Sequence, residues 1–228
     1  MSALTGAYAD LGAVDHWGFD GSGPGTTIGE PVFVDSIVGG LAAATDGDDG
    51  FVVRPNLSAW ADEFSVAFWL LPTAGTATGD VLRWGSTPGV GVVLNGGEGA
   101  QQPGTATIWV RLSNGAHPLR WTTPEPLSPD QWHLLVVTVR PVSVWGGVEA
   151  VAYVDGEQAA SGRYSGGLFD WVNLRRPSTL TVLAGGASAA VDEWAWFDRR
   201  LTSSGVARIA AAGPSDTSVA RYGWGVVF

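Results

Sequence analysis

Carboxylates are the first side chains to consider for chemistry, because the chain has seven glutamates and fifteen aspartates. A retaining glycoside hydrolase needs two carboxyl groups only about 5–5.5 Å apart. The strongest candidates are Asp192 and Glu193, which are adjacent in a run with strand character. Neighbouring residues of a strand point to opposite faces of a sheet, so this pair is not expected to share a cleft. The sequence therefore predicts a protein that is not an enzyme.

Aromatic side chains offer a second kind of chemistry, since an exposed aromatic face with polar groups beside it can hold a sugar. Residues 105–112 alternate, so that Trp109 and Arg111 lie on the less apolar face of a strand. Trp84 and Trp121 end two further short runs. We predict these four residues as glycan contacts. Two alternatives stay open, namely burial in the core and coverage of Trp109 by a partner subunit.

The elements that would position these side chains are short strands. Glycine (33 residues) and proline (13 residues) are frequent, helical periodicity is rare, and this pattern favours a sandwich or a barrel. An Asp155-Gly156 pair predicts a hairpin turn, and one short helix is expected between Thr202 and Gly213. The clearest strand candidates are residues 64–71, 105–112, 132–139, 148–154, 157–161, 180–184 and 191–197.

Composition limits the classes of partner. The chain of 228 residues carries a net charge of -10, which argues against nucleic acid and against an anionic membrane surface. It has no cysteine, so disulfides are excluded, and no apolar run approaches the roughly 20 residues of a membrane helix. The first residues lack the basic and apolar segments of a secretory signal, so we expect synthesis in the cytosol.

Five motifs in one order carry a resemblance to a known family. They lie in residues 15–22, 64–72, 127–138, 152–157 and 191–202. Together they resemble the laminin-G-like jelly roll of the concanavalin A-like lectin/glucanase superfamily. The resemblance covers residues 15–213 and implies an all-β fold, a two-sheet antiparallel jelly-roll sandwich with one short C-terminal helix. It also implies core positions for Trp17, Trp69, Trp132 and Trp194.

The same resemblance implies a structural calcium ion, which members of the superfamily often hold between their first and last strands. The matching positions are Asp20 and Asp192. Residues 46–50 form a second oxygen-rich segment of the kind that suits Ca²⁺. The alternative is that these aspartates make turns and bind loop N–H groups.

Two segments lie outside the resemblance. We expect an N-terminal arm (1–14), the jelly-roll domain (15–213) and an aromatic C-terminal tail (214–228). Tyr222, Trp224 and Phe228 of the tail are predicted assembly contacts, either with further copies of the chain in a homo-oligomer or with other virion proteins. Docking of both segments on their own domain is the alternative.

The function expected from these features is that of a virion protein. All 12 basic residues are arginine, which is typical of a GC-rich genome. We expect a minor tail protein of a phage with an actinobacterial host, whose jelly roll binds host surface glycan. The alternatives are a capsid decoration protein without a sugar site, a bacterial polysaccharide-binding module and, with least support, a glycoside hydrolase.

Overall fold

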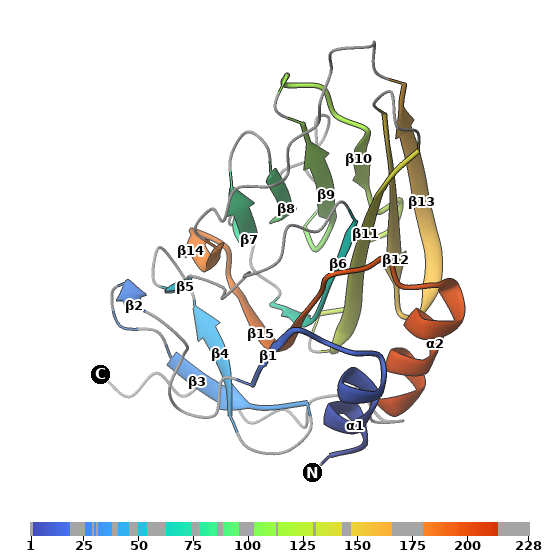
Figure 1. The fold of residues 1–228 in the computed structure, drawn as a ribbon. Coiled ribbons are helices and arrows are strands. Elements are labelled where there is room, and N and C mark those ends of the chain that lie inside the picture. Colours follow the sequence, from blue (N-terminus) through green and yellow to red (C-terminus); the bar gives the residue numbers. More distant parts are fainter. Residues whose placement is uncertain are drawn as a thin grey trace.

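The computed structural model describes residues 2–18, 26–28, 30, 32–37, 41–45, 50–53, 63–73, 78–85, 89–95, 103–112, 114–129, 131–142, 147–165 and 180–213. These residues form two antiparallel sheets that pack face to face, and two short helices (Figure 1). The predicted all-β sandwich is therefore confirmed.

Sheet A contains eight of the described strands. Their order is β13 (Glu157–Tyr164), β12 (Val148–Val154), β11 (His133–Pro141), β6 (Phe64–Pro72), β15 (Ala189–Phe197), β4 (Leu41–Thr45) and β3 (Val32–Asp35), and β1 (Asp15–Trp17) also pairs with β15.

Sheet B contains seven strands of the described residues. Their order is β10 (Leu119–Thr122), β9 (Ala106–Arg111), β8 (Gly89–Leu94), β7 (Gly79–Gly85), β14 (Leu180–Gly185), β5 (Gly50–Val53) and β2 (Thr26–Ile28).

The main core fills the space between the two sheets. Strand β9 shows how it is built, because Ile108 and Val110 point into the core while Trp109 and Arg111 stay partly exposed on the other face. This is the alternation expected from the sequence. Aromatic rings close the centre of the core, where Phe64 stacks on Trp196 with ring centroids 4.7 Å apart and Trp84 packs edge-on against both.

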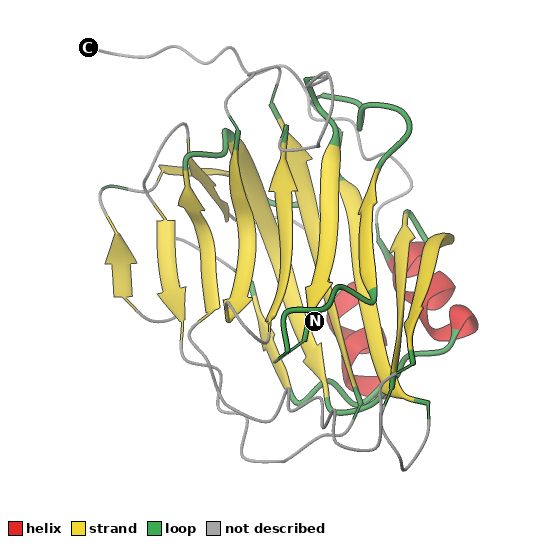
Figure 2. Ribbon diagram, turned by 90° about the horizontal axis from the view of Figure 1, so that it is seen from above, coloured by secondary structure: helices red, strands yellow, loops and turns green. Residues whose placement is uncertain are grey.

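A second core lies on the outer face of sheet A. Helices α1 (Ala3–Asp10) and α2 (Ser203–Ala212) cover that face (Figure 2). Leu4, Tyr8, Val206 and Ile209 of the helices are buried against apolar residues of the sheet. This explains why the central strands β6 and β11 are apolar on both faces. Neither helix has the length and apolar content of a membrane span.

Helix α1 was not expected, because the helix predicted from the sequence is the one between Thr202 and Gly213. Ser2 caps the helix, since its Oγ accepts a hydrogen bond from the Thr5 backbone N–H at 3.1 Å. Leu4, Ala7 and Tyr8 share one buried face at helical spacing. Most of the arm thus docks on its own domain. The aromatic tail with Tyr222, Trp224 and Phe228 lies outside the described residues.

Two of the resembling motifs meet at one hairpin. Asp155 and Gly156 adopt positive φ angles of 52° and 88° and form the predicted tight turn between β12 and β13. The Asp155 carboxylate accepts the Leu134 backbone N–H at 2.9 Å and lies 2.8 Å from Nδ1 of His133. The resembling segments 127–138 and 152–157 are therefore joined by hydrogen bonds.

Candidate functional site

The outer face of sheet B carries a row of side chains that come from five adjacent strands. The strand register pairs Thr181 with Arg83, Arg83 with Gly91, Gly91 with Trp109, and Trp109 with Arg120. Both helices lie on the other sheet, so no helix among the described residues covers this row (Figure 2). We call these five residues the Trp109 row.

The Trp109 indole approaches the sheet closely at Gly91, because this neighbour has no side chain. A Cβ atom added to Gly91 would stand 2.4 Å from two ring carbons of the indole and 2.7 Å from its Nε1. The indole therefore rests on the Gly91 backbone, and the Trp109 residue is partly exposed. Glycine inside a strand often marks such a close approach. The result is an aromatic platform of the kind that carbohydrate sites use.

Basic side chains lie around this platform. Arg83 pairs with Asp80, with Nη2 and Oδ2 2.8 Å apart. Arg111 lies on the same face as Trp109, and its buried Nε has no hydrogen-bond partner in the described part of the chain. His117 is close enough to Arg111 and Arg120 for both to lower its pKa, in addition to the larger effect of partial burial. Two arginine side chains therefore lie near His117 at this end of the sheet.

The connection between β9 and β10 is held in place by its own polar groups. The Asn114 side chain accepts the Ala116 backbone N–H at 2.9 Å, and its Nδ2 donates to the hydroxyl of Tyr164 at 2.9 Å. Gly115 supplies a positive φ of 84°. These bonds tie the loop that carries His117 to strand β13 of the opposite sheet. The basic end of the Trp109 row is thereby fixed before any ligand binds.

The other predicted glycan contacts do not join the row. Trp84 is 5% exposed and packs against Phe64 and Trp196 between the sheets, so it lies away from the outer face. Trp121 pairs with Ile108, whose side chain points inward, and it packs against the main core while staying partly exposed. Of the four predicted glycan contacts, Trp109 and Arg111 therefore lie at the candidate site. The structure adds four residues to this site, namely Gly91, Arg83, Arg120 and His117.

Asp192 and Glu193 depart from the expected geometry. The pairing of β15 with β6 shifts register between Asp192 and Ala195, so one extra residue bulges from the strand, and Glu193 takes a φ of 50°. Both carboxylates consequently bind groups on the α1 side of sheet A. The prediction that they point to opposite faces is wrong, because strict alternation ends at the bulge.

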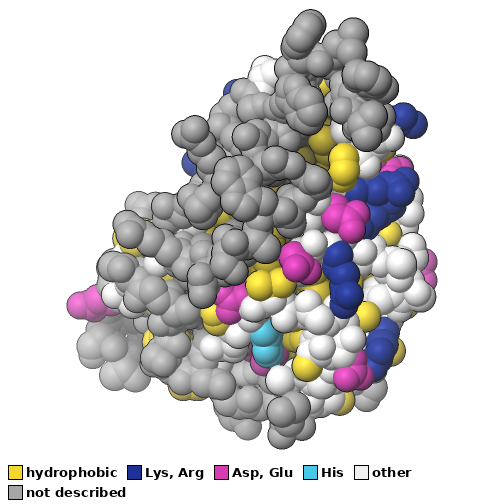
Figure 3. Space-filling model, in the orientation of Figure 1, with side chains coloured by type: hydrophobic (Ala, Val, Ile, Leu, Met, Phe, Trp, Pro, Cys, Tyr) yellow, Lys and Arg dark blue, Asp and Glu magenta, His cyan; other side chains and the backbone are white. Residues whose placement is uncertain are grey.

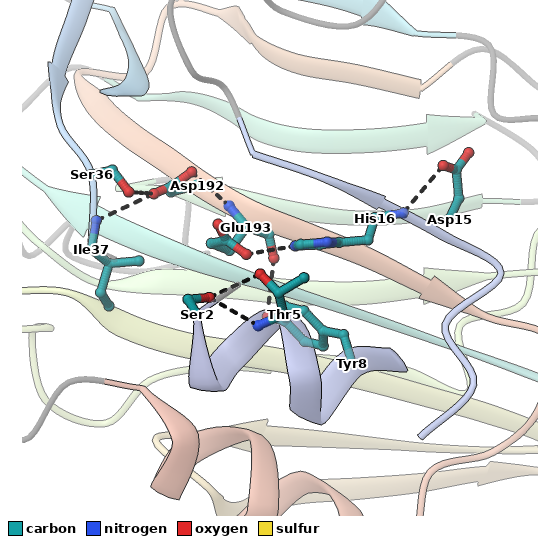
Figure 4. A network of polar contacts seen from close by, with 9 residues as sticks. All are labelled: Ser2, Thr5, Tyr8, Asp15, His16, Ser36, Ile37, Asp192 and Glu193. Atoms are coloured by element: carbon teal, nitrogen blue, oxygen red, sulfur yellow. Dashed lines mark hydrogen bonds and ion pairs between the residues drawn. The ribbon is translucent and has the colours of Figure 1, made fainter. Parts of the chain in front are cut away.

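A polar network occupies both carboxylates (Figure 4). Asp192 accepts hydrogen bonds from the Ser36 hydroxyl at 2.5 Å and from the Ile37 backbone N–H at 3.2 Å. Glu193 lies 2.5 Å from Nε2 of His16, and its backbone carbonyl accepts the hydroxyl of Tyr8 at 3.0 Å. Burial is the main reason that the pKa of Asp192 is raised to about 6.

This network has a structural role that the strand order explains. β15 pairs with β4 up to Val191 and with β1 from Trp194 onward. Asp192 lies between the part of β15 that pairs with β4 and the part that pairs with β1. Its carboxylate accepts hydrogen bonds from the segment that follows β3. The carboxylate thus satisfies backbone groups where the sheet edge changes partner.

The calcium prediction concerns Asp20 and Asp192, of which the structure describes Asp192. Ca²⁺ takes six to eight oxygen ligands, whereas the oxygens of Asp192 already accept hydrogen bonds from Ser36, Ile37 and Glu193. Nowhere in the described ranges do three acidic, histidine or cysteine side chains gather as metal ligands would. Asp20 and residues 46–49 lie outside the described residues, so the Asp20–Asp192 site stays a prediction.

Comparison with known proteins agrees with the fold. Residues 45–207 match a family model, Laminin_G_3, described as the concanavalin A-like lectin/glucanases superfamily. This confirms the resemblance carried by the five sequence motifs. No curated protein matches the chain.

Solved structures with a similar fold include domains that bind ligands. Domain 4 of the GH43 extracellular arabinanase AbnA from Geobacillus stearothermophilus, in complex with arabinotriose, superposes with a TM-score of 0.61 and 20% identity, and the match covers 87% of this chain and 98% of that one. The botulinum neurotoxin serotype D ligand binding domain, in complex with N-acetylneuraminic acid, gives a TM-score of 0.63 at 12% identity.

A third similar structure is the binding domain of Paraclostridial Mosquitocidal Protein 1, with a TM-score of 0.59, 13% identity and coverage of 82% of this chain. The match to the botulinum neurotoxin serotype D domain described above covers 92% of this chain. This chain spans 52% of that toxin domain and 47% of the mosquitocidal one, or about half of each. At these identities the likeness concerns the fold alone.

Proposed function

Because this chain belongs to the laminin-G-like family of the concanavalin A-like lectin/glucanase superfamily, we propose that it is a carbohydrate-binding domain whose site is the outer face of sheet B. The observation that carries this proposal is the partly exposed indole of Trp109, which lies against Gly91. The apolar face of a sugar ring packs on such a surface, and neighbouring polar groups bind its hydroxyls.

The proposal is supported by what similar folds hold. One neighbour was solved with arabinotriose and another with N-acetylneuraminic acid. Those ligands belong to those proteins, and for this chain they indicate which classes of compound to test. A glycan array that contains neutral pentose and hexose oligomers as well as acidic sugars covers both classes.

The test of the site compares three proteins on that array. Trp109→Ala removes the platform and is expected to weaken binding roughly tenfold or more, equivalent to about 1.4 kcal/mol. Gly91→Ala keeps the tryptophan but places a methyl group where the indole lies, so it should weaken binding as well. Val52→Ala, on the same face but far along the sheet, is the control and should bind like wild type.

Melting curves of all variants exclude loss of binding through unfolding. Retained binding by both Trp109→Ala and Gly91→Ala would show that the sugar site is elsewhere. Failure of the wild-type protein to bind any glycan would contradict the function itself.

We propose binding without catalysis. In support, Asp192 and Glu193 are held in the network beneath α1, away from the Trp109 row. Incubation with each glycan that binds should release no new reducing ends over a day. If Asp192→Asn and Glu193→Gln still release reducing ends and a heat-treated sample does not, the protein is an enzyme whose active site lies elsewhere.

The virion setting and the contact role of Tyr222, Trp224 and Phe228 remain proposals that rest on composition. The chain uses arginine for all its basic residues, which is typical of a GC-rich genome. Genes for tail or capsid proteins beside this one would support a virion protein, and genes of carbohydrate metabolism would contradict it. If the Trp109 row is covered by a second subunit in the assembled particle, the protein is structural and has no sugar site there.

A further inference from the structure

We propose that Asp80 and Arg83 are polar contacts of the sugar site, and that together they bind two neighbouring hydroxyl groups of a neutral sugar ring packed on Trp109. The inference rests on the proposed function, and it names the class of ligand for the same site, a neutral glycan with a free vicinal diol. It follows from the course of strand β7, which carries both residues to the outer face of sheet B.

Strand β7 breaks its alternation next to the Trp109 row. Its register with β8 shifts between Asp80 and Leu82, so that one extra residue bulges from the strand. Val81 and Leu82 are consequently both buried in the main core. Strict alternation would turn Asp80 to the face opposite that of Arg83. The bulge instead brings Asp80 to the same outer face, three residues before Arg83.

The adjacent strand β14 fits around this bulge. Its register with β7 shifts between Val182 and Gly185, and Leu183 there has a φ of 60°, which a bulky residue rarely adopts. A Cβ atom added to Gly185 would lie 2.7 Å from the Cβ and from the backbone N of Asp80. Strained backbone of this kind is often found at binding sites. The two strands therefore hold Asp80 in position before any ligand binds.

The ion pair leaves groups that are able to bind a ligand. Nη2 of Arg83 lies 2.8 Å from Oδ2 of Asp80, and the Arg83 side chain is 50% exposed. Within the described part of the chain, the Asp80 carboxylate has no partner besides Arg83. Burial raises the pKa of Asp80, although the charge and the hydrogen bond of Arg83 lower it. A carboxylate that is partly removed from water is stabilised by a ligand hydroxyl that donates to its second oxygen.

The strand register places this pair beside the platform. Arg83 stands opposite Gly91, and Gly91 stands opposite Trp109. Neighbouring strands are about 5 Å apart, so about 10 Å separates the backbones of Arg83 and Trp109. The indole spans part of this distance, because it lies against Gly91. A sugar ring packed on the indole therefore presents its hydroxyls to Arg83 and Asp80.

An acceptor and a donor side by side fit a diol. A hydroxyl both donates and accepts, so one sugar hydroxyl donates to the Asp80 carboxylate while its neighbour accepts from the Arg83 guanidinium. Neighbouring hydroxyls of a ring stand about one hydrogen-bond length apart, as Nη2 of Arg83 and Oδ2 of Asp80 do. Hydrogen bonds to charged groups are stronger than those between neutral groups. An acidic sugar would bring its own negative charge to Asp80, so the pair favours a neutral one.

The experiment measures affinity by calorimetry for neutral hexasaccharides with free vicinal diols, namely arabinohexaose, xylohexaose and mannohexaose. Each is compared with its O-methylated form, which keeps the ring but has no hydroxyl left to donate. At least one free hexasaccharide should bind, and its methylated form should bind roughly tenfold more weakly or worse. Oligogalacturonate of the same length is the acidic probe, and it should bind more weakly than the best neutral one.

Two variants assign this preference to residues. Asp80→Asn and Arg83→Gln should each weaken binding of the neutral probe roughly tenfold. Asp80→Asn should also raise the affinity for oligogalacturonate by about twofold or more, because a negative charge leaves the site. A merely structural role of Asp80 would weaken the binding of both probes. Opposite changes for the two probes therefore identify a direct contact.

The matched control is the ion pair between Asp10 of α1 and Arg208 of α2. The helices lie on the face seen in Figure 3, where acidic and basic side chains lie next to one another. Asp10→Asn and Arg208→Gln make the same changes of charge, and both should bind every probe like wild type. Melting curves monitor the fold of each variant. If Asp80→Asn does not fold, Arg83→Gln decides the test, because the Arg83 side chain is half exposed.

The outcomes separate this inference from the proposed function. Neutral binding that Trp109→Ala abolishes, but that Asp80→Asn or Arg83→Gln retains in full, overturns the diol contact and leaves the sugar site intact. Equal affinity for the free and methylated forms, or tighter binding of oligogalacturonate than of every neutral probe, overturns the inference as well. So does binding of other glycans on the array without binding of these hexasaccharides. Absence of binding to any probe and to the whole array overturns the function and the inference together.

Discussion

A carboxyl group that is 1% exposed, as that of Asp192 is, keeps its proton more firmly than a solvated one. Burial is the leading cause, and the nearby charge of Glu193 acts in the same direction, so the pKa rises from 3.8 to about 6. Between these values the folded chain binds more protons at this position than the unfolded chain. Stability therefore falls as the pH rises through that window.

We predict that Asp192→Asn removes this dependence. Each pKa unit is worth about 1.4 kcal/mol, so the wild-type protein should lose on the order of 2–3 kcal/mol relative to the variant between pH 4 and pH 7. Urea unfolding at four pH values in the same salt measures the difference. Parallel stability curves for the two proteins would show that Asp192 titrates normally in the fold.

At the scale of elements, the β12–β13 hairpin depends on backbone geometry that few residues adopt. Gly156 has a φ of 88°, and a Cβ there would stand 2.8 Å from the Cβ of Ala210 in α2. The turn thus fixes the register of the hairpin and the position of α2 against it. A side chain at this position strains the backbone and pushes α2 away.

Gly156→Ala should therefore lower the free energy of unfolding by about 1–3 kcal/mol. Gly6→Ala is a matched control, because Gly6 lies within α1 and nothing is found within 4 Å of its added Cβ. That change should stabilise the protein by about 0.5–1 kcal/mol. If chemical denaturation shows the two changes to have the same sign, the turn does not constrain the fold in this way.

Several elements were predictable from the sequence, because they rest on local patterns. Alternation placed Trp109 on the outer face of β9, and the Asp-Gly pair placed the turn. The sequence did not lead us to Gly91 as the residue under the Trp109 indole, although glycines at alternate positions 89 and 91 of one strand were a usable signal. The bulge at Glu193 depends on how β15 changes neighbours, a long-range pairing that no local pattern encodes.

For the molecule as a whole, the two sheets differ in what covers them. Sheet A has the main core on one face and the helices on the other, whereas the outer face of sheet B carries the Trp109 row. If the proposed site is correct, the helix-covered core and the binding surface lie on different sides of the sandwich. Changes on one side should leave the property of the other unaltered.

Leu4→Ala tests this separation. Leu4 is fully buried on the face of α1 that packs against sheet A, so the truncation should lower the free energy of unfolding by about 2–5 kcal/mol. Glycan affinity measured well below the melting temperature should not change. Ala9→Ser on the exposed face of α1 is the control and should stay within about 0.5 kcal/mol of wild type. A loss of affinity in Leu4→Ala that matches its loss of stability would contradict the separation.

The outer face of sheet B, which neither described helix covers, also makes the chain a candidate framework for directed evolution. Positions 52, 83, 111, 120 and 181 project from five different strands, and none belongs to either core. Randomising them while retaining Gly91 would diversify the recognition surface without touching the interior. Selection from such a library should return folded binders for targets far removed from the natural one.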